Sequence, residues 1–298
     1  MIKSTLLDYL SDNDVKCKSP VNTAELVTFK VGGVGSLAVF PQSIQQLCDI
    51  ISIVKDDRYV VLGNGSNCYF THNYFDGIII VTSGINKTTA YDNVIYAECG
   101  ATVNSVCKLA LKNRLTGMEF AFGIPGTIGG AITMNASAFG GCFADIVIKS
   151  TAFDIYSGET VELNNEEHRF DTKKSIFQRG RMCLLSTCIT LNQGEENKIR
   201  EKMNELFKRR ALSQPLDMPS AGSTFIKPEG YYASRLIDLA GLKGYTVGGA
   251  QVSTKHAGFI VNLGNATATD VHKLIEYVKK AVYKKFNVEL NEEIIYLE

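Results

Sequence analysis

The stretch EFAFGIPGTIGGAITMNASAFGG, residues 119–141, is the most unusual segment of the chain. Its glycines are too dense for an ordinary helix, because a glycine in a helix interior costs about 1 kcal/mol relative to alanine. So many small residues allow a flat or extended ligand to lie against the main chain. A tight crossing of two chain segments is the alternative. The polar continuation Met134-Asn135-Ala136-Ser137 favours contact with a ligand.

A second glycine-rich loop, Gly63-Asn64-Gly65-Ser66-Asn67, directly follows the apolar stretch Tyr59 to Leu62, which we expect to be a strand. A glycine loop in that place lets backbone N–H groups approach a phosphate, and the Ser and Asn side chains add donors. It is neither a Walker loop nor a G-x-G-x-x-G fingerprint, and taken alone a plain turn explains it equally well. Two such loops in consecutive α/β units nevertheless suggest a dinucleotide that bridges them.

Apolar periodicity predicts strands and helices around both loops. Strands are expected at 36–40, 59–62, 77–81, 94–97 and 182–191, helices from Pro41 to about 54 and at 102–113, and a hairpin at 151–163 with its turn at Ser157-Gly158. A polar break at 192–197 marks the predicted domain boundary. Beyond it we expect helices to about 211, at 233–240 and at 269–286, strands at 247–252 and 259–262, and a closing strand at 288–297.

Composition and charge narrow the class of protein. The 298 residues, 45% of them hydrophobic, can bury one large domain or two to three smaller ones, which excludes a disordered chain. The 31 basic residues balance the 31 acidic ones without a long basic block, which argues against nucleic acid or anionic membranes and favours a small-molecule partner. No stretch approaches the roughly 20 apolar residues of a membrane span, and the N-terminus lacks a signal-peptide core. We therefore expect a cytoplasmic protein.

Cysteine and histidine usage gives no sign of a metal site. The eight cysteines include no CxxC pair, and we interpret them as reduced and mostly buried small hydrophobic residues. The four histidines, at positions 72, 168, 256 and 272, are scattered without ligand spacing. We expect no bound metal.

The C-terminal third contains two candidate polar sites. The segment 219–225 reads PSAGSTF and places Ser223 beside a glycine turn, but without the G-x-S-x-G elbow of a hydrolase nucleophile. The spacing fits Ser223 equally well as a proton donor and as a turn or N-cap serine. Lys255-His256 precedes the apolar residues 257–260 and offers a cation and a donor, although a solvated strand end is the simpler interpretation.

Three glutamates lie on the expected closing strand. Alternation with a period of two puts Glu289 and Glu293 on one face and Glu292 on the other. One carboxylate could point into a site, but the pattern alone favours a solvated face.

Five segments together resemble the UDP-N-acetylenolpyruvoylglucosamine reductase (MurB) family, the flavoproteins of peptidoglycan precursor synthesis. They are TFKVGG (28–33), VLGNGSN (61–67), GIPGTIGGAITMNASAFGG (123–141), SQPLDMPSAGSTF (213–225) and AGLKGYTVGGAQVSTKHAGFIVN (240–262). Their occurrence in the family's order makes the resemblance specific, and it covers most of the chain. The spacing from the hairpin to residues 213–225 resembles the shorter class of the family, which lacks an extra loop.

The resemblance implies an α+β fold class. The N-terminal two thirds would form the two-subdomain FAD-binding fold of the vanillyl-alcohol-oxidase (PCMH) type, followed by a C-terminal α/β substrate domain. The expected ranges are an N-terminal helical segment at 1–20, the FAD-binding domain at 21–192 with subdomains at about 21–82 and 83–192, and the substrate-binding domain at 193–298.

The resemblance also implies non-covalently bound FAD, with NADPH as co-substrate. By motif match, the pyrophosphate would be held by Gly63, Asn64, Gly65, Ser66 and Asn67. The rest of the flavin would be lined by Gly123, Ile124, Pro125, Gly126, Thr127, Gly129 and Gly130, and bordered by Lys30, Val31, Gly32 and Gly33.

In the family's reaction, NADPH reduces FAD, and a hydride then passes to the enolpyruvyl group of UDP-N-acetylglucosamine enolpyruvate, giving UDP-N-acetylmuramate. Ser223 matches the family's proton donor. Glu293 matches the glutamate near the substrate carboxylate, a role that requires a protonated or hydrogen-bonded carboxyl group. Lys227, Lys255 and His256 are the expected substrate-binding residues. We expect a monomer whose partners are the nucleotide sugar and NADPH.

Two positions depart from the family pattern. The family's Tyr-Arg-x-Ser reads Thr172-Lys173-Lys174-Ser175, so Lys173 takes the place of a catalytic arginine, or Lys174 if the alignment shifts by one. A lysine keeps the charge but not the planar fork that grips a carboxylate at two points. Ile226 replaces a polar family residue. These changes support an alternative hypothesis: an FAD-binding paralogue with weak or no turnover that acts as a nucleotide-sugar binding protein or a regulatory protein. A third hypothesis is an oxidase of the wider FAD family that uses oxygen.

Overall fold

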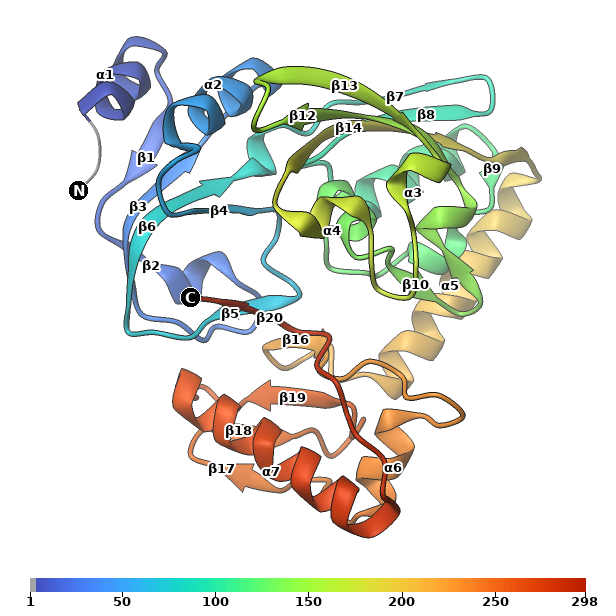
Figure 1. Ribbon diagram of the computed structural model, residues 1–298. Helices are drawn as coiled ribbons and strands as arrows, with labels where there is room; N and C mark the ends of the chain where they lie inside the picture. Colours follow the sequence, from blue (N-terminus) through green and yellow to red (C-terminus); the bar gives the residue numbers. More distant parts are fainter. Residues whose placement is uncertain (1–3) are drawn as a thin grey trace. The chain divides into compact units, whose positions relative to one another are not determined.

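The computed structural model describes residues 4–298, so the first three residues of the expected N-terminal segment lie outside the described residues. The chain forms two compact units (Figure 1). Unit 1 contains the chain up to Ser19, Leu37–Asn64 and Asp76–Arg209, and unit 2 contains Pro20–Ser36, Gly65–Phe75 and Arg210–Glu298. These ranges cut the chain differently from the expected domains, because unit 2 includes two segments from the N-terminal third. The assignment of FAD-binding and substrate domains to ranges remains a prediction.

Unit 1 is built on a five-stranded antiparallel sheet with the strand order β13-β12-β14-β8-β7. These strands are β7 (Thr88–Tyr91), β8 (Val94–Glu98), β12 (Val147–Asp154), β13 (Glu159–Asn164) and β14 (Met182–Thr190). The first two strands of the order, β13 and β12, form the predicted hairpin, whose turn contains Gly158 in the left-handed conformation (φ 74°). The hairpin prediction is therefore confirmed.

Further strands of unit 1 belong to a second sheet and to two-stranded ladders. They are β1 (Lys16–Lys18), β4 (Tyr59–Leu62), β9 (Leu115–Thr116), β10 (Ser137–Ala138), β11 (Gly141–Cys142) and β15 (Asn192–Gln193), together with most of β3 (Val34–Phe40) and β6 (Tyr74–Val81). The order β1-β3-β6-β4 forms one sheet, in which β4 and β6 are parallel. The strand predicted at 59–62 is confirmed as β4.

The helices of unit 1 are α1 (Ser4–Asp12), α2 (Ile44–Val54), α3 (Val103–Lys112), α4 (Ile128–Thr133) and most of α5 (Glu196–Ser213). Three of them, α2, α3 and α4, begin after a serine or threonine whose side chain caps a free N–H group of the first turn. Ser43 caps α2, so this helix starts after the cap and not at Pro41 as expected, whereas α3, capped by Thr102, confirms the helix predicted at 102–113. Apolar faces of α1 to α4 and of the sheets form one continuous hydrophobic core.

Unit 2 contains a four-stranded antiparallel sheet with the order β16-β19-β18-β17. Its strands are β16 (Ser220–Ser223), β17 (Thr246–Val247), β18 (Ala250–Val252) and β19 (Phe259–Asn262), and its helices are α6 (Ala233–Leu239) and α7 (Ala268–Phe286). The helix α7 packs on β17 and β18 through a fully buried apolar face that includes Val271, Leu274 and Val278 (Figure 1). Thr267 and Asp270 form a capping box at its start. The helices predicted at 233–240 and 269–286 are confirmed.

The remaining strands of unit 2 are β2 (Val21–Asn22), β5 (Cys68–Phe70) and β20 (Ile295–Leu297), and β5 and β20 pair in parallel. The predicted closing strand at 288–297 is wrong over its first seven residues. That part of the chain makes single backbone hydrogen bonds and one isolated bridge, Phe225 to Glu292, in place of a continuous ladder. The two faces assigned to the glutamates at 289–293 therefore do not exist.

No helix within residues 4–298 combines the length and the apolar character that crossing a membrane requires. The prediction that most cysteines are buried is confirmed, because five of the eight are buried, at positions 48, 68, 99, 107 and 183. The combination of a largely antiparallel strand framework with separate helices is the expected α+β class.

Candidate functional site

In unit 1, the two glycine loops that the sequence singles out lie against each other. A Cβ atom on Gly63 would collide with the side chain of Thr127, so only glycine fits this approach. Beside it, the Asn64 side-chain amide donates a hydrogen bond to the carbonyl oxygen of Pro125. The predicted loops at 63–67 and 123–130 thus meet through Gly63 and Asn64, as two loops contacting one ligand would require.

The backbone of the segment 123–130 is fixed from the side of α3. Val103 N donates to Gly126 O at 3.0 Å, and Ile128 N donates to Ala101 O at 2.8 Å. Gly129 packs so closely on Cys99 that a Cβ atom would lie 2.9 Å from the Cys99 carbonyl oxygen. The structural-crossing interpretation is therefore correct for Gly129.

The opposite side of this segment is open. Gly130 is exposed, and the nearest atom to a Cβ atom placed on it, Thr127 Oγ1, would be 3.6 Å away. Gly123, in the left-handed conformation at φ 90°, is only partly buried. The backbone conformation of Gly123 favours glycine by itself, whereas packing does not explain the glycine at 130. Both residues leave main chain partly uncovered, against which a flat ring system can lie. The residues present therefore fit a flavin.

In unit 2, the segment 30–33 is held by close packing within the unit. A Cβ atom on Gly32 would collide with Thr23 Oγ1, and one on Gly33 would collide with the Asn73 carbonyl oxygen. Lys30 has a left-handed backbone (φ 57°), and its carbonyl oxygen accepts from the Asn262 side chain at 3.1 Å. These contacts explain the glycines without a ligand, and the contact of Lys30, Val31, Gly32 and Gly33 with a flavin remains a prediction.

Unit 2 also holds the second half of the loop 63–67. Gly65 is left-handed (φ 56°) and packs on Leu26 and Val27, and its carbonyl oxygen accepts from Thr28 N at 3.1 Å. The side chain of Asn67 donates to the carbonyl oxygen of Glu293 at 3.0 Å. Asn67 therefore supports a predicted catalytic residue through that residue's backbone, a role the sequence did not reveal.

The structure places Glu293 beside the strand that carries Ser223. Glu293 N donates to the carbonyl oxygen of Thr224 at 2.8 Å, and Thr224 directly follows Ser223 at the end of β16. Gly222, left-handed at φ 77°, makes the predicted glycine turn before Ser223. Both Ser223 and Glu293 are partly exposed, so both can reach a ligand.

The neighbouring Glu292 has a different environment. Its carboxylate forms an ion pair with Lys279 of α7 at 2.8 Å, and both side chains are half-buried. This pairing neutralises Glu292 and ties it to the helix. The backbones of both glutamates are held near the end of β16, Glu292 by its bridge to Phe225 and Glu293 by its bond to Thr224. The carboxylate of Glu292, however, is paired with Lys279.

Three further predicted residues of unit 2 are positively charged or polar. Lys227 places its ammonium group 4.6 Å from the centre of the Tyr232 ring, and Lys255 donates to the carbonyl oxygen of Ala211. His256 Nδ1 accepts from Gly258 N at 3.2 Å, and burial is the main cause that lowers the pKa of His256 from its usual 6.5. A ring that is neutral at pH 7 can donate from Nε2 to a ligand.

Lys173 lies in unit 1, at the tip of a tight turn. Asp171 and Lys174 exchange two backbone hydrogen bonds of 3.1 Å each, and Lys173 between them is left-handed at φ 58°. The turn presents a single lysine at a defined point. Lys174, the substitute if the alignment shifts by one, lies at the base of the same turn and is exposed.

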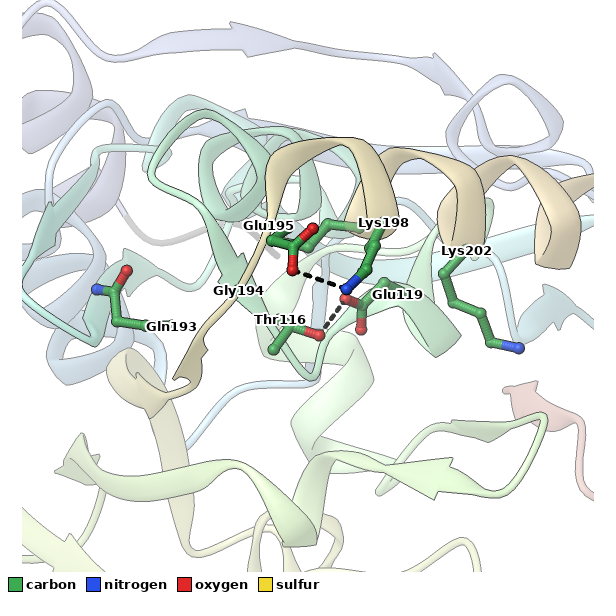
Figure 2. Close-up of a pocket in the computed structure, with 8 residues that line it drawn as sticks. Thr116, Glu119, Gln193, Gly194, Glu195, Lys198 and Lys202 are labelled. Carbon is green, nitrogen blue, oxygen red and sulfur yellow. Dashed lines mark hydrogen bonds and ion pairs between the residues drawn. The ribbon is translucent and has the colours of Figure 1, made fainter.

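A surface pocket of about 730 Å³ in unit 1 contains none of these residues (Figure 2). Most of its lining residues have polar side chains, and Figure 2 shows the ion pair of Glu195 with Lys198 (2.7 Å) and the hydrogen bond from Thr116 to Glu119 (2.6 Å) among them. The pocket is therefore separate from the candidate site.

Comparison with known proteins agrees with this arrangement. Residues 36–164 match the family model described as "FAD binding domain", and residues 214–297 match "UDP-N-acetylenolpyruvoylglucosamine reductase, C-terminal domain". The chain is 42% identical over 279 residues to the UDP-N-acetylenolpyruvoylglucosamine reductase of Clostridium novyi, covering 93% of this chain and 91% of that protein. The chain belongs to the UDP-N-acetylenolpyruvoylglucosamine reductase family.

Other members of the family are similar over nearly as much of the chain. The reductase of Caldanaerobacter subterraneus is 44% identical over 269 residues, covering 90% of this chain and 89% of that protein. The crystal structure of the reductase (MurB) of Thermus caldophilus superposes with a TM-score of 0.80 at 29% identity, covering 95% of this chain and 99% of the other. The fold is thus an FAD-binding domain of the PCMH type with the family's C-terminal domain, as the sequence predicted.

Proposed function

We propose that this chain is an FAD-dependent oxidoreductase that uses NADPH to reduce UDP-N-acetylglucosamine enolpyruvate to UDP-N-acetylmuramate, a step of peptidoglycan precursor synthesis. The observation that carries the proposal is the hydrogen bond from Glu293 N to Thr224 O, which holds Glu293 beside the residue that follows Ser223, in a chain of this family. The lysine at position 173 is the reason to consider a binding protein. The relatives described above are named as reductases, so the reductase is the single function proposed.

FAD supplies a carrier that takes a hydride from NADPH and gives it to the enolpyruvyl double bond. Addition of that hydride to the terminal carbon leaves a negative charge on the neighbouring carbon and its carboxylate, and a proton must be added there to complete the reduction. The work of the protein is to bind and orient the substrate, to stabilise this charge and to provide the proton.

Ser223 is the proposed proton donor. A serine hydroxyl is a weak acid, so it can act only against a strongly basic carbon and from a fixed position. The fixed position is supported by the pairing of Ser223 with Phe259 across β16 and β19 and by the hydrogen bond from Thr224 N to Gly258 O at 2.8 Å. Glu293 is proposed to contact the substrate carboxylate from the adjacent segment.

Lys173 is proposed to stabilise the same carboxylate with its positive charge. An ammonium group binds a carboxylate as a point charge, whereas a guanidinium group makes two parallel hydrogen bonds. Lys227, Lys255 and His256 are proposed to bind the nucleotide part of the substrate. A cation and a donor on the same strand end as Phe259 suit an anionic diphosphate.

The residues proposed to hold FAD are the loop 63–67, the segment 123–130 without Ile128, and the segment 30–33. The open main chain at Gly123 and Gly130 supports this assignment for the isoalloxazine side. We further propose that the protein acts in the cytoplasm, where its nucleotide substrates are made, and that it works as a monomer.

An anaerobic two-step experiment tests the proposed function. The flavin-loaded protein is reduced with NADPH, the enolpyruvyl nucleotide sugar is added, and the flavin absorbance is followed. Return of the oxidised spectrum, with formation of UDP-N-acetylmuramate, is the expected result. A flavin that is reduced but stays bleached after addition of the substrate would refute the reductase function and leave the binding-protein alternative.

A further inference from the structure

His168 is a fully buried histidine for which the proposed reaction has no use. It lies on the short 3-10 helix at Glu166–His168, after β13, and its exposed fraction is 0%. Nδ1 is 2.7 Å from the carbonyl oxygen of Asn164, and Nε2 is 2.8 Å from Ser150 Oγ on β12. A carbonyl oxygen only accepts, so Nδ1 carries a hydrogen, and in the neutral ring Nε2 accepts from the Ser150 hydroxyl.

The hydrogen-bonded contacts of the His168 ring continue through Ser150 into the five-stranded sheet. Ser150 Oγ and Thr187 Oγ1, both buried, lie 3.0 Å apart between β12 and β14, and Thr187 Oγ1 is 3.1 Å from Lys149 O. With the Ser150 hydrogen directed at Nε2, the single hydroxyl hydrogen of Thr187 goes either to Ser150 Oγ or to Lys149 O. The imidazole is thus tied to β12 directly and to the central strand β14 through Ser150 and Thr187. Its position is fixed by the five-stranded sheet.

The faces of the same ring hold the segment that carries Lys173. Phe170 stacks on His168 with ring centres 4.8 Å apart and planes 12° apart, and Phe177 meets it edge-on at 5.7 Å. Phe170 comes just before the turn 171–174 and Phe177 just after it. One imidazole therefore contacts both arms of the turn.

The rest of the turn is fastened to the end of α4. Ser175 Oγ donates to Thr133 O at 2.8 Å, and the Asn135 side chain donates to Asp171 O at 3.1 Å. These two bonds fix the base of the turn along the helix end, and they do not fix it against the sheet. Contact with the sheet comes from His168 and from the 3-10 helix Ile176–Arg179, which packs on β14.

We infer that His168 is a positioning residue, which holds the Lys173 turn against the sheet through its two ring hydrogen bonds and its contacts with Phe170 and Phe177. The inference rests on the proposed function insofar as Lys173 contacts the substrate. The Gln178 side chain donates to Lys173 O at 2.9 Å, so the backbone of the left-handed lysine is held by the turn and by the arm that follows it. A small shift of the turn therefore displaces its ammonium group from the substrate carboxylate, and such displacement slows a reaction that depends on orientation.

The kinetic test is a double-mutant cycle between His168 and Lys173. His168→Phe keeps a flat ring and removes both ring hydrogen bonds, and Ser150→Ala keeps the ring and removes one partner. We expect His168→Phe to slow reoxidation of the reduced flavin by the nucleotide sugar about tenfold, and to have almost no further effect in a Lys173→Ala background. The same loss in both backgrounds would show a general structural role and overturn the inference.

Tyr9→Phe is the matched control, because it removes one side-chain hydrogen bond of unit 1, from Tyr9 to Asp49 at 2.8 Å, that involves neither the sheet nor the turn. His168→Phe and Ser150→Ala should both leave flavin reduction by NADPH unchanged. If His168→Phe does not fold, Ser150→Ala carries the test, with a smaller slowing that again disappears without Lys173. Slowing by Ser150→Ala no greater than that by Tyr9→Phe would overturn the inference.

A second readout does not need turnover. Amide hydrogen exchange of the flavin-loaded protein, read on a peptide that spans residues 169–179, should become faster in His168→Phe and in Ser150→Ala, and should be unchanged in Tyr9→Phe. Unchanged amide hydrogen exchange in both His168→Phe and Ser150→Ala would overturn the inference even if the enzyme is active. If the wild-type protein shows no turnover, the proposed function fails, and the exchange result alone decides whether His168 positions the turn.

Discussion

The backbone amide of Glu293 donates a hydrogen bond of 2.8 Å to the carbonyl oxygen of Thr224. This bond connects the C-terminal segment to the end of β16, so the backbone of Glu293 is held beside the residue that follows Ser223. The Asn67 side chain donates to the carbonyl oxygen of Glu293 at 3.0 Å and fixes the same residue from the other side. Two side chains proposed to act on one substrate carboxylate and its neighbouring carbon thus share one backbone frame.

Ser223→Ala should leave flavin reduction by NADPH intact and slow reoxidation by the nucleotide sugar by about 10²–10⁴-fold, because only the second step needs the proton. The two half-reactions are measured separately by stopped-flow absorbance. Ser220→Ala on the same strand is the control, since its hydroxyl only accepts a long 3.5 Å bond from Gly222 N. Equal slowing of both half-reactions would contradict the assignment of Ser223.

Glu293→Gln should slow the same second half-reaction, because an amide does not stabilise the developing charge as a protonated or hydrogen-bonded carboxyl group does. Glu292→Gln is its matched control. That change breaks the ion pair with Lys279 and should lower the free energy of unfolding by about 0.5–1 kcal/mol without slowing reoxidation. If Glu292→Gln slows the chemistry and Glu293→Gln does not, the two glutamates have been assigned in the wrong order.

Lys173→Arg should preserve or raise the rate of reoxidation, because arginine adds a two-point grip on a carboxylate while keeping the charge. The left-handed backbone at φ 58° costs both residues the same, so the turn itself should not change. Single-turnover rates of Lys173→Arg and Lys174→Arg decide which lysine is involved. A large loss in Lys173→Arg would mean that the pocket is shaped around lysine.

Most of the secondary structure could be predicted from the sequence, because apolar periodicity in α3, α7 and the hairpin reflects local burial. The segment 288–294 misled the prediction, since its alternating Val, Leu and Ile positions resemble a strand while its hydrogen-bond partners are scattered. Close packing at Gly32 and Gly63 depends on residues distant in sequence, and no local pattern reports it. The catalytic residues came from motif resemblance, whereas Asn67 and His168 act through contacts that only the fold reveals.

Gly130→Ala separates helix stability from flavin binding. A Cβ atom at this exposed helical position meets nothing closer than 3.6 Å, so alanine should stabilise the flavin-free protein by about 0.4–1 kcal/mol. If the open face of α4 contacts the flavin, the same methyl group should weaken FAD binding. Thermal unfolding of the flavin-free form and FAD titration measure the two effects.

Gly63→Ala is the contrasting variant, because its Cβ atom would collide with Thr127 and should destabilise the protein with or without FAD. Unchanged FAD affinity in a stabilised Gly130→Ala protein would remove Gly130 from the flavin site.

Stability should fall as the pH drops below about 6.5, because burial lowers the pKa of both His168 and His256 from 6.5. Below that pH the unfolded chain binds protons at these two histidines that the folded protein does not bind. The stability contributed by the neutral rings therefore falls with pH until the pH lies below their lowered pKa values in the folded protein. Above pH 7 neither group changes the stability.

Two carboxylates change the folding stability in a separate and more acidic pH range. The Arg181 side chain lowers the pKa of Asp154 from 3.8, and the Thr267 amide lowers that of Asp270, so their contribution is lost only as the pH falls below about 4. Urea unfolding midpoints measured between about pH 5 and 8 therefore isolate the histidines. His168→Phe should flatten the dependence in this range, because one of the two proton-linked groups is gone. An unchanged slope in His168→Phe would mean that the buried ring takes up its proton in the folded state.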